Sequence, residues 1–126
     1  PYVVIIEMGA NDGLRGLSLI AAKNNLQSMI SNCQKHAAKV LLIGMQIPPN
    51  YGKQYTLDFS NMYRQLAEET HVAWVAFLLA GFADNVAYTQ VDGIHPNAKA
   101  QALMLNNVWP HLLPLLKKKK NLPRKD

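Results

Sequence analysis

The chain has 126 residues, 49% of them hydrophobic, and a formal net charge of +5. That size and composition support one hydrophobic core and exclude both a second core and disorder throughout the chain. The single cysteine, Cys33, excludes an internal disulfide and a zinc site of paired cysteines. No apolar run approaches the roughly 20 residues that cross a bilayer, so we expect no stable membrane insertion.

The net positive charge lies at one end of the chain. Residues 117–126 carry six basic side chains and one acidic side chain, whereas residues 1–116 carry seven of each kind. A terminal basic run is more often a solvated tail than a binding surface for phosphate backbones or membranes. We therefore expect residues 117–126 to be a disordered tail, and we predict no nucleic-acid partner.

The first half of the chain alternates short apolar runs with an amphipathic pattern. Residues 3–8 and 40–44 are continuous apolar runs with β-branched residues, as in strands that are buried on both faces. Between them, apolar residues recur at helical spacing over residues 26–37. The pattern predicts a strand, a helix and a second strand.

The second half repeats this alternation. Asp58 is a candidate N-cap for an amphipathic helix, and residues 72–77 form a third apolar run. A last helix is predicted after Pro96, because proline suits a first helical turn. Pro110 and Pro114 are predicted to kink or end that helix, since each removes a helical hydrogen bond.

Strands separated by helices predict a parallel sheet with right-handed crossovers. The expected fold class is therefore α/β, with the three layers of an αβα sandwich. In open sheets of this kind, ligands bind beyond the carboxyl ends of the strands. The segments after those ends are residues 9–16, 45–55 and 78–96, and we expect the functional residues in them.

A segment with the sequence Gly9-Ala10-Asn11-Asp12-Gly13 follows the first predicted strand. The side-chain amide of Asn11 can donate a hydrogen bond to the oxygen of a carbonyl group under attack and so stabilise a tetrahedral oxyanion. The alternative is a simple tight turn, since Asn, Asp and Gly are typical turn residues. Taken alone, the segment favours the turn.

A second segment, Asp92-Gly93-Ile94-His95-Pro96, precedes the last predicted helix. Its spacing lets the Asp92 carboxylate contact one nitrogen of His95, so that the other nitrogen can act as a base toward a nucleophilic hydroxyl. The alternative is a capping aspartate beside an exposed loop histidine. The other three histidines have no such aspartate nearby, and we interpret them as ordinary surface or helix residues.

Together, the two segments resemble the third and fifth conserved blocks of the SGNH hydrolases, the GDSL-type family. The resemblance extends to Gly13-Leu14-Arg15-Gly16 and to residues 45–52, which are similar to the bacterial acyl-CoA thioesterase I, arylesterase and lysophospholipase branch. It covers residues 2–116 and implies a flavodoxin-like parallel sheet. Residues 1–116 would then be the C-terminal two-thirds of one hydrolase domain.

The resemblance also implies a role for each matching residue. It makes His95 the general base and then acid, Asp92 its orienting partner, and Asn11 an oxyanion-hole donor. Three further residues are implied to border the oxyanion or acyl site: Gly9, Ile47 and Ile94. No metal or organic cofactor is implied, since no ligand cluster or glycine-rich phosphate loop is present in the sequence.

The chain departs from the family pattern at two points. The usual Gly-Gly-Asn-Asp is Gly9-Ala10-Asn11-Asp12, and the Gly-Asp-Ser block with the nucleophilic serine has no counterpart. Family members carry that block in an N-terminal third, on a strand that pairs with the one represented here by residues 3–8. We therefore expect this chain to begin inside a longer protein and to receive its serine from an N-terminal segment of that protein.

The function implied is hydrolysis of acyl esters or thioesters through an acyl-enzyme, with this chain inactive by itself. Aryl esters, thioesters and lysophospholipids remain unranked as small-molecule substrates, and residues 78–91 are either a mobile apolar wall of the site or a packed connecting loop. The family also implies a role in lipid metabolism and a periplasmic or secreted location. The alternative is a non-catalytic α/β module that binds a partner or ligand at its exposed strand edge.

Overall fold

The computed structural model of the chain describes residues 2–9, 18–47, 51–83, 85–91 and 95–117. Its elements follow in the order β1 (Val3–Ile6), α2 (Leu19–Lys35), β2 (Lys39–Ile43), α3 (Lys53–Thr70), β3 (Ala73–Val75), the 3-10 turns η2 (Val86–Tyr88) and η3 (Ala98–Ala100), and α4 (Gln101–Leu116). None of these helices is long and apolar enough to cross a membrane.

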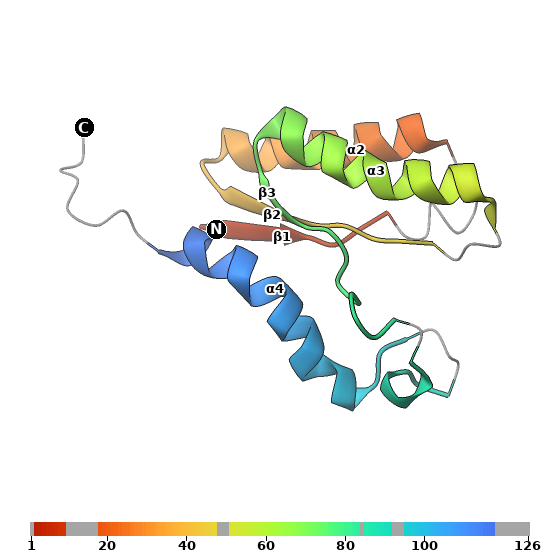
Figure 1. Cartoon of the computed structure of the whole chain (residues 1–126). Coiled ribbons are helices and arrows are strands. Elements are labelled where there is room, and N and C mark those ends of the chain that lie inside the picture. Colours follow the sequence, from red (N-terminus) through yellow and green to blue (C-terminus); the bar gives the residue numbers. More distant parts are fainter. Residues whose placement is uncertain (1, 10–17, 48–50, 84, 92–94, 118–126) are drawn as a thin grey trace.

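The three strands form one parallel sheet in the order β1-β2-β3. In this register Ile5 of β1 lies opposite Leu41 of β2, and Leu41 lies opposite Ala73 of β3. Helices α2 and α3 cover one face of the sheet and α4 crosses the other (Figure 1). The predicted αβα sandwich is confirmed.

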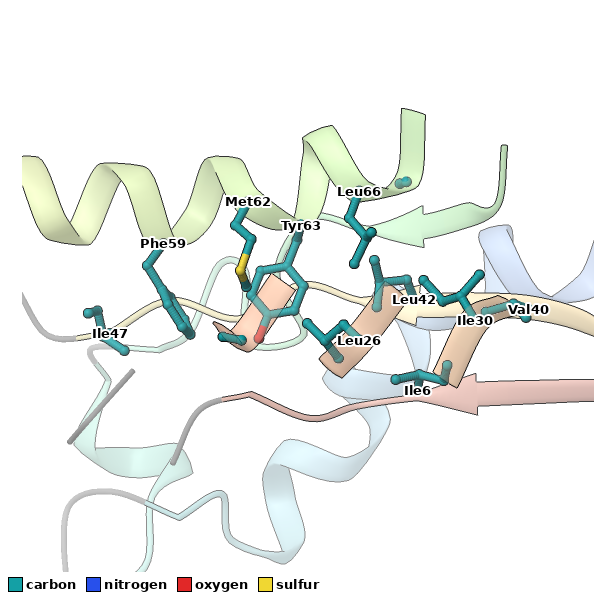
Figure 2. Close-up of a cluster of buried hydrophobic side chains, with 12 residues drawn as sticks. Ile6, Leu26, Ile30, Val40, Leu42, Ile47, Phe59, Met62, Tyr63 and Leu66 are labelled. Atoms are coloured by element: carbon teal, nitrogen blue, oxygen red, sulfur yellow. The ribbon is translucent and has the colours of Figure 1, made fainter. Parts of the chain in front are cut away.

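The central strand β2 separates two hydrophobic clusters. Its residues Val40 and Leu42 point into the larger cluster beneath α2 and α3 (Figure 2), whereas Leu41 and Ile43 point into a smaller one beneath α4. Side chains alternate between the faces of a strand, so both faces of β2 are filled with apolar residues. This burial explains why β2 is apolar from Val40 to Ile43.

Two predicted helix boundaries are wrong. Helix α3 begins at Lys53, so Asp58 lies inside the helix, where its carboxylate accepts a hydrogen bond from Gln54 Nε2 at 2.8 Å. The apolar face of α3 already starts with Tyr55, which packs against the larger cluster, and this contact extends the helix beyond the local capping signal. Helix α2 ends at Lys35, and Ala37 follows it with a positive φ of 59° rather than continuing the apolar stripe.

Helix α4 continues through Pro110 and Pro114 to Leu116, so neither proline ends the helix, and the predicted kink stays a prediction. Each proline removes one N–H donor from the helix, but Val108, Leu112 and Leu115 pack against the smaller cluster on either side of them. Burial of these side chains holds the helix together despite the missing hydrogen bonds, since tertiary packing supplies most of the stability of helices in proteins.

Candidate active site

Three of the six residues predicted to form the site lie in the described part of the chain. Gly9 and Ile47 follow β1 and β2 at the carboxyl edge of the sheet, and His95 lies in the connection from β3 to α4. The other three lie outside the described residues: Asn11, Asp92 and Ile94. The roles of all six therefore stay predictions.

Ile47 belongs to the larger core cluster. It is 4% exposed and lies beside Phe59 of α3 (Figure 2). A side chain in this position anchors the segment after β2 to the core. Its predicted contact with an acyl chain stays untested.

The turn after β1 is held by Tyr63 of α3. The Tyr63 hydroxyl donates a hydrogen bond to the carbonyl oxygen of Met8 at 2.7 Å, and the ring is otherwise buried edge-to-face against Phe59. In Figure 2 the hydroxyl of Tyr63 points from the helix toward the strand layer. The backbone that leads to the predicted oxyanion donor is thus fixed at Met8.

Gly9 allows this close approach. It has a φ of +111°, which favours glycine, and a Cβ atom at this position would clash with the Tyr63 hydroxyl oxygen. The family resemblance implied Gly9 as a site residue, whereas no role in the site was predicted for Tyr63. The one available signal was a hydroxyl-bearing ring within a stripe of Phe, Met and Leu, because a buried tyrosine hydroxyl usually finds a partner.

The backbone of His95 is tied to the segment that follows η2. The amide of Gln90 donates to the carbonyl oxygen of His95 at 2.7 Å, and Thr89 and Pro96 form an antiparallel bridge. The side chain of Gln90 also donates to the Pro96 carbonyl oxygen at 3.2 Å. Hydrogen bonds therefore join residues 89–90 to residues 95–96.

Asn97 is the centre of this junction. Its Nδ2 donates to the carbonyl oxygens of Ala87 at 2.8 Å and Thr89 at 3.1 Å, while its Oδ1 accepts a hydrogen bond from the Ala100 amide at 3.2 Å. Its own amide donates to the Tyr88 carbonyl oxygen at 2.9 Å. The side chain thus caps η3 and holds the η2 segment at the same time. Sequence reasoning missed it.

The connection from β3 to η2 is a packed loop, the second of the two predicted alternatives. Nδ2 of Asn107 on α4 donates to the carbonyl oxygens of Leu78 at 2.9 Å and Ala80 at 3.0 Å. Phe82 is buried and its ring meets that of Tyr88 edge-to-face, with centroids 5.7 Å apart. The described part of residues 78–91 is held by Asn107 of α4 and by the contact between its own two aromatic rings.

The four serines of the chain all lie at or within α2 and α3. The hydroxyl of Ser18 accepts a hydrogen bond from the first turn of α2, and that of Ser60 donates to the Thr56 carbonyl oxygen inside α3. Ser28 and Ser31 are on the exposed side of α2. None follows a strand, as a nucleophilic serine in a Gly-Asp-Ser block would. Within the described ranges, no group of three or more His, Cys, Asp or Glu side chains could hold a metal ion.

The sequence model of the GDSL-like lipase/acylhydrolase family matches residues 1–103. The chain belongs to this family. The resemblance inferred from the glycine-asparagine and aspartate-histidine segments is thereby confirmed, together with the predicted branch, because the relatives below carry the names of that branch.

Individual relatives agree with the family match. The chain is 47% identical over 116 residues to the esterase TesA of Pseudomonas aeruginosa, an alignment that covers 92% of this chain and 58% of TesA. It is 34% identical over 116 residues to thioesterase 1/protease 1/lysophospholipase L1 of Escherichia coli, which covers 92% of this chain and 56% of that protein. The chain thus spans a little over half the length of these relatives.

Solved structures give the same result for the fold. A crystal structure of TesA matches with a TM-score of 0.87 at 46% identity, covering 92% of this chain and 64% of that one. The psychrotrophic esterase EstA from Pseudoalteromonas, inhibited by monoethylphosphonate, matches with a TM-score of 0.86 at 34% identity, covering 94% and 64%. The described helices and strands therefore have the arrangement of an SGNH hydrolase.

Proposed function

We propose that this chain is the C-terminal part of a serine hydrolase that cleaves acyl esters or thioesters through an acyl-enzyme. The observation that supports this most directly is the hydrogen-bonded junction that carries His95 after the last strand of an SGNH sheet. The names of the relatives, esterase and thioesterase/lysophospholipase, support the same reaction class. Small-molecule esters or thioesters are the proposed substrates, with lipid metabolism as their setting.

In the proposed reaction, a serine hydroxyl adds to the acyl carbonyl carbon while His95, oriented by Asp92, removes its proton. The imidazolium then gives this proton to the departing alcohol or thiol as the C–O or C–S bond breaks. Water repeats the sequence and releases the carboxylic acid and the serine. Asn11 would donate a hydrogen bond to the oxyanion in both halves, a contact worth about 10²–10³ in rate in related chemistry.

The nucleophilic serine is proposed to come from an N-terminal segment of the same protein, outside the 126 residues. Among the described strands β1 pairs with β2 alone, and its residue Ile5 is 49% exposed although it points to the face that α4 crosses. Helix α4 packs against β2 and β3. A strand paired to the free edge of β1 would remove this apolar edge from water. By family likeness, the whole protein is proposed to be periplasmic or secreted. The predicted basic tail, residues 117–126, lies outside the described residues except for Lys117.

The test uses the longer protein that contains these residues together with the proposed segment. Hydrolysis of p-nitrophenyl acyl esters should fall by about 10²–10⁴-fold in kcat on His95→Ala substitution, since that is the usual contribution of a general base. His111→Ala on the exposed side of α4 is the matched control and should leave kcat unchanged. Full activity in the His95→Ala protein would refute the proposed role of His95.

A complete absence of turnover in the unsubstituted longer protein would favour the second candidate, a binding module. The exposed edge of β1 is the specific observation for that candidate, because unpaired strand edges accept further strands. A fluorophosphonate probe distinguishes the two directly. It should label one serine of the longer protein outside residues 1–126 if the hydrolase proposal is correct, and no serine if the protein only binds.

A further inference from the structure

The Asn97 side chain makes more hydrogen bonds than a simple helix cap requires. An N-cap side chain requires only its oxygen, which here accepts from the Ala100 amide. The two remaining donors of the amide are directed to the carbonyl oxygens of Ala87 and Thr89, in the segment on the other side of the junction. Aspartate or serine would cap η3 equally well but could not make this pair of bonds.

These two bonds lie close to His95 in the chain and can therefore affect the position of its backbone. Asn97 lies two residues after His95, and Thr89 lies one residue before Gln90, whose amide holds the His95 carbonyl oxygen at 2.7 Å. The Asn97 side chain and the Gln90 amide therefore join the same two segments, residues 87–90 and residues 95–97. Loss of the Asn97 side-chain bonds would remove two of the hydrogen bonds between these segments and leave the backbone bonds of Gln90 and Asn97 and the side-chain bond from Gln90 to Pro96.

We propose that Asn97 is a positioning residue for His95, which fixes the backbone of the histidine through its hydrogen bonds to Ala87 and Thr89. The inference rests on the proposed function, because it assumes that His95 is the general base. A misplacement of a catalytic group by about 1 Å can cost on the order of 10²-fold in rate, and it acts on the transition state more than on substrate binding. The effect should therefore be on kcat, with little change in KM.

Asn107 provides a matched control within the same region. Its Nδ2 also donates to two loop carbonyl oxygens, those of Leu78 and Ala80, at nearly the same distances as in Asn97. Both side chains are half-buried. These bonds hold the loop before η2, whereas those of Asn97 hold the junction with His95. Loss of either amide should lower the Tm, because two carbonyl oxygens lose a partner.

The experiment compares Asn97→Ala, Asn97→Asp and Asn107→Ala in the longer protein, with p-nitrophenyl butyrate as substrate and at a temperature where all variants are folded by circular dichroism. Asn97→Asp keeps the cap acceptor for Ala100 but loses both donors. We expect both Asn97 variants to lower kcat by about 10–100-fold with KM within about twofold. Asn107→Ala should lower the Tm by a similar amount yet keep kcat within about twofold.

Three outcomes would overturn the inference while the proposed function stands. In a protein whose His95→Ala variant is inactive, a folded Asn97→Asp variant with unchanged kcat would show that the donors are not needed. Equal losses of kcat in the Asn97 and Asn107 variants would show a general effect of loop stability. If neither Asn97 variant folds, Asn97→Ser keeps a cap acceptor for Ala100 without the pair of amide donors, and unchanged kcat there would also overturn it. Full activity of His95→Ala would refute the proposed function and the inference together.

Discussion

At the scale of single residues, Gly9 and Tyr63 form the contact that fixes the turn after β1. A methyl group at residue 9 would meet two obstacles: the positive φ of +111° and the Tyr63 hydroxyl. Gly81 allows the first effect to be measured without the second, because it has a φ of +91° but open space where its Cβ would lie. Gly81→Ala should therefore cost about 1–2 kcal/mol from backbone strain, and Gly9→Ala about 1–3 kcal/mol more from the clash. Urea unfolding of the longer protein measures both, and equal costs would contradict the assignment.

A double substitution tests the clash itself. Tyr63→Phe removes the hydroxyl and leaves the nearest ring carbon at an ordinary contact distance of 3.5 Å from the added methyl group. It also removes the bond to Met8, so it should cost about 1–2 kcal/mol by itself. The two substitutions together should then cost less than the sum of the single costs by about 1 kcal/mol or more. Strict additivity in the double-mutant cycle would mean that the two residues do not interact.

Residues that act through their neighbours were beyond prediction from the sequence. His95 could be named because an aspartate precedes it at a spacing with a chemical meaning. The roles of Asn97 and Tyr63 could not be predicted, because their partners are backbone carbonyl oxygens from 8 to 55 residues away. Every residue has a carbonyl group, so the sequence does not indicate which one is the partner. What the sequence predicted was the chemistry of the site, whereas the side chains that hold its backbone came from the folded structure.

At the scale of elements, the strands were predicted better than the ends of the helices. Both faces of β2 are buried, so its residues from Val40 to Ile43 are all apolar, and such a run can be recognised in the sequence without knowledge of its neighbours. Helix ends depend on tertiary contacts instead. Asp58 is a good capping residue by type, but α3 starts earlier because Tyr55 packs on the core.

In helix α4, too, a local signal against the helix competes with tertiary packing that favours it, and the two contributions can be measured separately. Pro110 is exposed and removes the donor that would otherwise reach the Asn106 carbonyl oxygen. Pro110→Ala should therefore raise the free energy of unfolding by about 1–2 kcal/mol, the helical gain less the entropy that proline removes from the unfolded chain. Leu112→Ala, on the packed side of the same helix, should lower it by about 2–3 kcal/mol. A destabilising Pro110→Ala substitution would mean that α4 requires the proline at this position.

At the scale of the whole molecule, the two faces of the sheet are unequally covered. Helices α2 and α3 lie over one face across the described sheet, whereas α4 crosses the other face over β2 and β3 (Figure 1). Ile5 and Leu41 are partners in the register and point to the same face, yet Leu41 is 0% exposed and Ile5 is 49% exposed. Position beneath α4, rather than side-chain type, decides this difference, because residues of α4 pack over Leu41.

The same pair of residues measures whether a further segment covers β1. In the longer protein, Leu41→Ala should cost about 2–5 kcal/mol, as for a large side chain in a closed core. If the proposed N-terminal segment pairs with β1 and completes this face, Ile5→Ala should cost nearly as much in urea unfolding of the same protein. If no segment covers β1, half of the side chain stays in water and the cost should be about 1 kcal/mol. An Ile5→Ala cost near this lower value would contradict the proposal that the N-terminal segment completes this face of the sheet over β1.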